Sequence, residues 1–256
     1  RRPDVPRPSA RAPERTAAEA DGGPLAGGDV ERLLADPAVA AEWGQTAGLA
    51  DPAVASRALV GLARQGITFD LLGGIIARLA TALPGCSDPD RVLVALERFV
   101  ASVRSPLATA TLFQRDPDSL GVLLAIFSAS PHLAELVIAD PEAWEAIRVG
   151  RGRPEKKESL AGELAAEIGG SLDPDAVLAA IRRFKRRQTL RIAYGDIVAG
   201  NRLEIVTAQL SHLADCVVEA ALGVALAAVE RQRGVPRGPD GSRATIAVIA
   251  LGKLGG

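Results

Sequence analysis

A regular series of proline dipeptides constrains the fold of this chain more than any other feature of its sequence. Eight times after residue 30, an aspartate or a serine stands directly before proline: at Asp36, Asp51, Asp88, Ser105, Asp116, Ser130, Asp140 and Asp173. Such a side chain accepts hydrogen bonds from the free N–H groups of a helix N-terminus. Proline fits the first helical position, because an N–H at that position has no partner within the helix. The series therefore predicts that most of these dipeptides begin a helix.

Three of the dipeptides extend to Asp-Pro-Asp, starting at Asp88, Asp116 and Asp173. Paired carboxylates of this kind could also hold a metal ion. Capping explains more, because it accounts for the proline and for the apolar helix that follows each site. The second aspartate of each motif also lies where the helix dipole favours negative charge. We therefore predict that Asp173 and its two counterparts cap helices and bind no metal.

Apolar side chains recur at helical spacing between these dipeptides. The segments 92–103, 120–127 and 133–137 each carry apolar residues in steps of three or four, with some adjacent pairs, as expected for the buried face of a helix. The longest helix is predicted from about Leu203 to about Glu230, with glycine and proline ending it. These stripes predict a mainly α fold in which the apolar positions form the core.

One segment departs from the helical pattern. Residues 245–251 read TIAVIAL, a short apolar run rich in β-branched residues that follows a turn of glycine, proline and aspartate. Such a run favours a buried strand, and we expect strand content to be confined to about residues 244–251.

The predicted strand runs directly into a glycine-rich turn. Phosphate groups are commonly held in such turns, because glycine lets the backbone N–H groups approach the anion closely. The candidate phosphate-binding residues are Gly252, Lys253, Gly255 and Gly256. Their spacing matches neither a Walker loop nor a dinucleotide fingerprint, so a purely structural tight turn remains the alternative.

A second candidate site is a basic stretch of a predicted helix. Six basic residues occur within residues 182–191. They surround the helix axis and do not form one stripe, so some of them are expected to face other parts of the protein. A solvated basic face is one interpretation. The other is contact with a nucleotide phosphate or an acidic partner, for which Arg183, Arg187 and Arg191 are the candidates.

Composition narrows the class of protein. Thirty basic and 31 acidic residues nearly balance, which argues against a globally basic nucleic-acid binder. Two cysteines and two histidines, Cys86, Cys216, His132 and His212, are too scattered for a zinc site, so we expect free thiols and no metal centre. We find no apolar stretch approaching a membrane span and no secretory signal. The expected location is the cytoplasm.

Several stretches resemble one enzyme family, in the same order along the chain. They are residues 124–142, 183–197 with the sequence RFKRRQTLRIAYGDI, 210–215 with LSHLAD, and 249–256 with IALGKLGG. Together they are similar to the bifunctional glutamine synthetase adenylyltransferase/adenylyl-removing enzymes. The resemblance covers about residues 95–256, whereas the first 90 residues or so resemble nothing that we can identify.

The resemblance implies a fold and a chemistry. Family members carry two nucleotidyltransferase domains of the DNA-polymerase-β type, each behind a helical segment. One domain transfers AMP from ATP to a tyrosine of glutamine synthetase, and the other removes it by phosphorolysis and releases ADP. Gly252, Lys253, Gly255 and Gly256 match the family's phosphate-binding turn. Mg²⁺ is implied as the metal. Glutamine synthetase and a nitrogen-signalling regulatory protein are implied as partners, with no nucleic acid and no membrane.

The fold class expected is therefore a mainly α helical lead-in region followed by the first strand of a polymerase-β-type α/β nucleotidyltransferase domain. The expected divisions are a disordered arm at 1–28, a helical extension at 29–104, the lead-in region at 105–240, and the strand with its turn at 244–256. The absence of methionine and the apolar run near the C-terminus suggest a piece of a longer protein.

The Asp-x-Asp pair that holds magnesium in the family does not occur after the turn in this sequence. We therefore expect no catalytic residue and no metal ligand within the chain, and no activity from it alone. The Pro- and Arg-rich start favours the adenylyl-removing half. The competing hypothesis is a non-catalytic α-helical interaction module that docks an acidic partner through residues 182–191.

Overall fold

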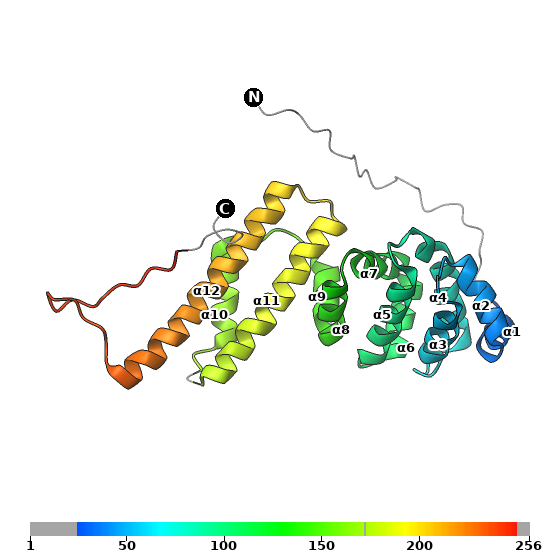
Figure 1. The fold of residues 1–256 in the computed structure, drawn as a ribbon, viewed down its shortest axis with the longest axis horizontal. Coiled ribbons are helices and arrows are strands. Elements are labelled where there is room, and N and C mark those ends of the chain that lie inside the picture. The colour runs from blue at the N-terminus through cyan, green and yellow to red at the C-terminus, as the bar shows by residue number, and fades with distance from the viewer. Residues whose placement is uncertain (1–24, 172, 250–256) are drawn as a thin grey trace, which may run out of the picture.

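The computed structural model describes residues 25–171 and 173–249, and within them the chain is almost entirely helical (Figure 1). The elements are α1 (Gly27–Ala35), α2 (Pro37–Thr46), α3 (Pro52–Ala63), α4 (Phe69–Ala82), the short 3-10 helix η1 (Leu83–Gly85), α5 (Pro89–Ser102), α6 (Pro106–Arg115), α7 (Pro117–Ala129), α8 (Pro131–Ala139), α9 (Pro141–Gly150), α10 (Lys157–Ile168), α11 (Pro174–Ile197) and α12 (Leu203–Arg233). The predicted mainly α fold is confirmed. The long helix predicted over residues 203–230 is also present, as α12.

All eight proline dipeptides begin a helix, with proline in its first turn. In seven of them the Asp or Ser side chain accepts a hydrogen bond from a backbone N–H of that turn, as predicted. The exception is Asp116, whose Oδ2 accepts from Nη1 of Arg148 at 2.9 Å and makes no capping bond. Capping therefore explains why these dipeptides recur along the chain. Asp116 also marks a helix start, but its side chain makes a tertiary contact.

Asp173 caps α11, as predicted, because its Oδ1 accepts from the backbone N–H of Asp175 at 3.1 Å. We expect Asp173→Ala to lower the free energy of unfolding by about 1 kcal/mol, the usual effect of a lost cap. Urea denaturation followed by circular dichroism measures this change, and Asp173→Asn, which keeps the accepting oxygen, is the matched control. Magnesium should leave the melting temperature unchanged. A magnesium-dependent shift that disappears in Asp173→Ala would contradict the capping role.

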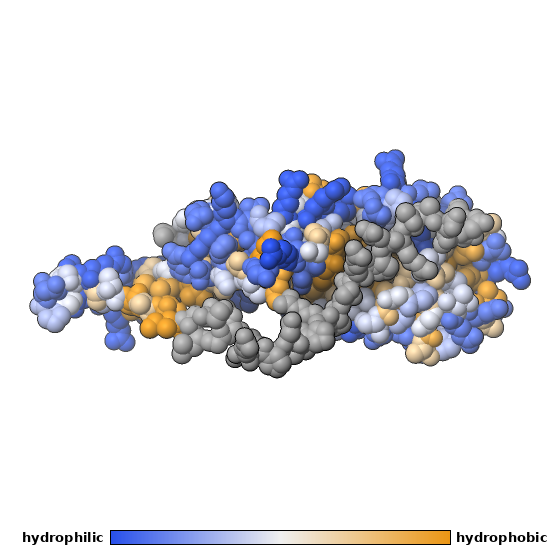
Figure 2. Space-filling model, turned by 90° about the horizontal axis from the view of Figure 1, so that it is seen from above, coloured by the Kyte–Doolittle hydropathy of each residue, from blue (hydrophilic) through white to orange (hydrophobic). Residues whose placement is uncertain are grey.

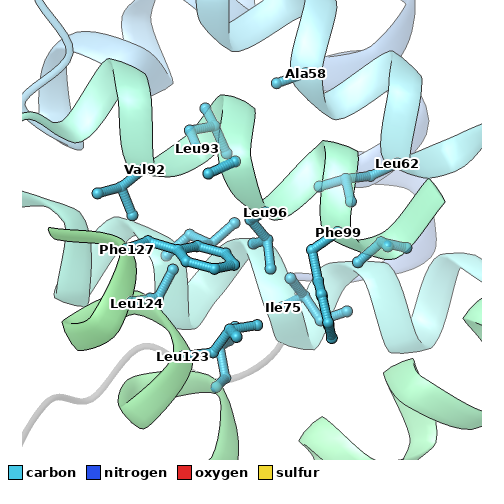
Figure 3. Close-up of a cluster of buried hydrophobic side chains, with 14 of the residues drawn as sticks. Ala58, Leu62, Ile75, Val92, Leu93, Leu96, Phe99, Leu123, Leu124 and Phe127 are labelled. Atoms are coloured by element: carbon cyan, nitrogen blue, oxygen red, sulfur yellow. The ribbon is translucent and has the colours of Figure 1, made fainter. Parts of the chain in front are cut away.

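The helices form two groups along the long axis of the molecule, each with its own hydrophobic core (Figure 1). Helices α1 to α9 enclose the first core, to which α11 adds Leu190 and Tyr194. Its central contacts join α5 and α7, where the rings of Phe99 and Phe127 meet edge to face with centroids 6.2 Å apart (Figure 3). The first core contains residues from both sides of residue 104, where the sequence analysis placed the boundary between the helical extension and the lead-in region.

The second core lies between α10, α11 and α12. Leu160, Leu164, Phe184, Val206 and Leu213 are buried there. Helix α11 contributes residues from Val177 to Ile192 to this core, and Leu190 and Tyr194 to the first core, so it connects the two groups as one continuous helix. The basic stretch predicted from the sequence lies in the middle of α11.

The predicted strand is not formed in the part of it that the structure describes. Residues 244–249 have no regular secondary structure, and Ile246, Val248 and Ile249 are 53%, 56% and 83% exposed. A strand needs a neighbouring strand to take up its backbone hydrogen bonds. Over residues 25–171 and 173–249 the one β contact is an isolated bridge between Arg237 and Arg243. Residues 250 and 251 of the predicted strand lie outside the described residues.

Helix α12 is more apolar than the sequence inspection indicated. Among the helices that the structure describes, it is the one whose length and composition would allow it to cross a membrane, with a mean hydropathy of 1.7 over 18 residues. Its apolar residues are interrupted by charged ones, so no uninterrupted apolar run reveals this property in the sequence. One such helix is weak evidence for a membrane span. Only 11% of the window is buried, so much of this apolar surface is not covered by the described residues.

Candidate functional site

The basic stretch of α11 divides into side chains that face solvent and side chains that bind other helices. Arg182, Arg183 and Lys185 are exposed, whereas Arg187 and Arg191 are partly buried. The expectation that the stretch surrounds its helix axis is therefore confirmed. Of the three candidate contacts with phosphate or a partner, Arg183 is the one directed to solvent.

Arg187 binds two carboxylates of α10. Its guanidinium pairs with Glu163 at 2.8 Å and also with Glu167. It lies 5.9 Å from the ring centroid of Phe184, close enough for a cation–π contact. Burial opposes the charge of Arg187, but the hydrogen bonds that its guanidinium donates to Glu167 and Glu163, together with their negative charges, outweigh this effect, so the pKa of Arg187 is raised. In this structure Arg187 holds α10 against α11.

Arg191 belongs to a polar network between α11, α12 and the segment before α10. Its Nη2 donates to Oε1 of Gln209 at 2.8 Å, its Nε donates to Gln188, and its Nη1 donates to the carbonyl oxygen of Arg153. Burial lowers the pKa of Arg191 below that of an ordinary arginine. Because its donors are used inside the protein, Arg191 acts here as a structural residue.

Gln209 is the centre of this network. Its side-chain amide accepts from the backbone N–H of Glu155 at 2.8 Å and donates to the carbonyl oxygen of the same residue at 2.7 Å. The pair of bonds resembles that between two β-strand residues, and it attaches the segment before α10 to α12. Gln209 is 6% exposed and Gln188 is 4% exposed. Buried side chains of this type are stable only when they are hydrogen-bonded.

Sequence inspection did not identify Gln209 or Glu155. The one available signal was a glutamine beside the apolar stripe of a long helix, and this pattern is common on half-exposed helices. Gln209 and Glu155 are 54 positions apart in the chain, and no local sequence pattern indicates that two residues so far apart will pair.

A close approach of two backbone segments lies next to this network. Gly152, at a φ of +62°, lies so close to Gly195 that an added Cβ would be 2.5 Å from the Gly195 nitrogen. Gly195 accepts from the N–H of Asn201 at 2.8 Å through its carbonyl oxygen. This contact explains the Tyr-Gly pair at residues 194–195, because a side chain at residue 195 would displace Asn201. The family-like stretch 183–197 thus serves the packing of the helical region.

No group of three or more His, Cys, Asp or Glu side chains that could hold a metal ion occurs in the part of the chain that the structure describes. Cys86 and Cys216 are free, and burial raises the pKa of both thiols. The candidate phosphate-binding residues Gly252, Lys253, Gly255 and Gly256 lie outside the described residues, so their assignment stays a prediction.

Comparison with known proteins places this geometry in a family. The profile of the glutamate-ammonia ligase adenylyltransferase family matches residues 120–256, which include most of α7, all of α8 to α12 and the glycine-rich residues 252–256. The bifunctional glutamine synthetase adenylyltransferase/adenylyl-removing enzyme of Pseudomonas putida is 30% identical over 83% of this chain and 23% of its own length. The enzyme of the same description from Thioalkalivibrio sulfidiphilus is 29% identical over 72% of this chain and 20% of its own length. No solved structure matches the chain significantly.

The match extends further toward the N-terminus than the motifs indicated. Aligning 83% of 256 residues needs about 212 positions, more than the 166 that follow residue 90. Part of the first 90 residues therefore has a counterpart in the Pseudomonas enzyme. The chain spans about a fifth to a quarter of the length of these relatives. Because the family profile matches more than half of its residues, this chain belongs to the glutamate-ammonia ligase adenylyltransferase family.

Proposed function

We propose that this chain forms the helical region and the first strand of one nucleotidyltransferase half in an enzyme that controls glutamine synthetase by adenylylation and de-adenylylation. The observation that carries the proposal is the continuous family match from residue 120 through the glycine-rich turn. The relatives that match are bifunctional enzymes for both reactions.

The half that we propose is the adenylyl-removing one, in which phosphate cleaves the AMP–tyrosine bond and ADP leaves. The chain's own contribution to this reaction would be the glycine-rich turn at residues 252–256, whose backbone would hold phosphate. Magnesium and the adenylyl-transferring substrate ATP would be used by the complete enzyme in the cytoplasm, with glutamine synthetase as its target and a nitrogen-signalling protein as its regulator. The helical region would support the turn, because α11 and α12 pack against each other and α12 precedes it in the chain.

The test is an assay of the full-length gene product. With adenylylated glutamine synthetase and phosphate, we expect release of ADP and loss of AMP from the tyrosine-bearing peptide, both followed by mass spectrometry. The chain of 256 residues alone, at the same concentration, should release no ADP, because it lacks the carboxylates that would hold magnesium. Release of ADP by this chain alone would contradict the proposal that catalysis needs residues of the full-length protein beyond these 256.

A second candidate function is a non-catalytic interaction module. The exposed side chains of Arg182, Arg183 and Lys185 on α11 favour it, because they present positive charge to solvent. This function predicts salt-sensitive binding to an acidic protein and no turnover by the full-length gene product. The same assay therefore separates the two functions.

A further inference from the structure

The face of helix α12 that points away from α10 and α11 changes from polar to apolar along the helix. Its packed face carries the buried side chains of Val206, Leu213 and Cys216. On the opposite face the first half of the helix is polar, with Glu204 and Ser211. The second half of the same face is apolar, with Val218, Leu222, Ala225 and Val229. These four residues, called the end patch below, follow steps of four, three and four and so form one stripe.

Much of the end patch stays exposed among the residues that the structure describes. Val218 is 37% exposed and Val229 is 52% exposed. From Ala220 to Val229 the helix has no polar side chain on any face. A helix that is apolar on all sides is normally buried, and an exposed apolar patch marks a surface that another element covers. Apolar surface is visible toward the left end of the molecule in Figure 2, where the C-terminal part of α12 and the segment that follows it both lie.

The chain after α12 turns back toward the helix. Residues 236–244 close a small loop, in which the N–H of Gly238 donates to the carbonyl oxygen of Ser242 at 2.8 Å, and that of Ala244 donates to Pro236 at 2.9 Å. Arg243 then pairs with Glu230, in the last turn of α12. Figure 1 shows the segment that follows, in red, running from this loop back toward the body of the molecule.

The returning segment is apolar and equally unpartnered. In an extended conformation Ile246 and Val248 lie on one side of it, because side chains alternate along a strand. They are 53% and 56% exposed. Two exposed apolar surfaces thus lie on one chain, joined by 11 residues and aligned by the ion pair of Arg243 with Glu230. Such a short connection gives the segment a high effective concentration at the helix.

We propose that residues 245–249 pack against the end patch of α12 as the first strand of the nucleotidyltransferase sheet, with Ile246 and Val248 facing the helix. The inference rests on the proposed function, because the strand needs its sheet before it can cover the helix. Within residues 25–171 and 173–249 it has no neighbouring strand, and both surfaces are exposed. In the complete protein α12 would then be the shared element that packs on α10 and α11 on one side and on the sheet on the other.

Thiol labelling in the full-length gene product tests this packing. Ala225→Cys places a thiol in the end patch, and Ser211→Cys places one on the polar half of the same face as the matched control. Both sites carry small residues that are exposed in this structure. With N-ethylmaleimide and peptide mass spectrometry, which resolves each cysteine separately, we expect the thiol at residue 225 to react at least about tenfold more slowly than the thiol at residue 211. Adding Ile246→Asp with Val248→Asp should make the two rates equal.

Three results would overturn the proposal. Equal rates at the two sites without the aspartates would show that the end patch is uncovered. Protection that disappears on dilution, together with a dimer mass by light scattering, would show that a second copy covers it. Protection that requires vesicles of mixed neutral and anionic lipid would identify a membrane as the occupant. The phosphorolysis assay is independent of this readout, so active enzyme with an unprotected thiol at residue 225 would refute the packing alone.

Discussion

Replacing Gln209 by leucine is expected to lower the free energy of unfolding of the α10–α12 unit by about 3–5 kcal/mol. Leucine fills a similar volume but removes the amide that binds both backbone groups of Glu155. It also leaves Arg191 without the acceptor for its Nη2. A buried donor or acceptor that loses its partner has given up its hydrogen bonds to water and gains none in return, which destabilises the folded state. The effect should therefore exceed that of a lost helix cap several-fold.

Urea denaturation followed by circular dichroism measures the effect. Gln232→Leu is the matched control, because Gln232 is exposed in the last turn of the same helix. It should change the unfolding free energy by less than about 0.5 kcal/mol, as surface substitutions usually do. If both variants unfold at the same urea concentration as the wild type, Gln209 does not hold the segment before α10 to α12.

The second large effect is expected in the full-length gene product, where Gly256→Val should abolish phosphorolysis of adenylylated glutamine synthetase. The resemblance to the family places Gly255 and Gly256 at the phosphates. A β-branched side chain would occupy the space through which the backbone approaches the anion. Removing a single donor from such a site costs roughly 100-fold to 1,000-fold in turnover. Lys253→Ala is expected to have a smaller effect, because a lysine in a turn can point to solvent.

Release of ADP at saturating phosphate measures this loss, and circular dichroism checks that the helical region stays folded. The matched control is Gly162→Val in α10, where an added Cβ would meet no atom within 4 Å. It should leave turnover unchanged. Normal turnover in Gly256→Val would mean that the turn is only structural and that phosphate is held elsewhere.

The helices could be predicted from sequence because the interactions that start them are local. A cap such as Asp36 binds the N–H of a residue two positions away, and the proline beside it is part of the same signal. Apolar spacing then identified some of the core positions, among them Phe99 and Phe127. The family could also be recognised, because several motifs occur in a fixed order.

The candidate site was less predictable, since side chains with the same local pattern have different partners. Arg183, Arg187 and Arg191 were equivalent candidates in the sequence. The structure leaves Arg183 exposed, pairs Arg187 with α10, and places Arg191 in a polar network. The predicted strand at 244–251 also depended on distant residues, because a strand forms only beside another strand.

The sequence by itself determined where eight of the helices begin, which faces several of them bury and to which family the chain belongs, because each of these depends on neighbouring residues or on the order of motifs. Only the tertiary structure decided where the polar side chains bind. Asp90 had the pattern of a first-turn acid of its own helix, yet its carboxylate accepts from the backbone N–H groups of Ala50 and Asp51. Its partners lie about 40 positions away, and only the packing of α5 on α3 brings them together. A hydrogen bond over such a distance depends on the complete fold, and so no local pattern can specify it.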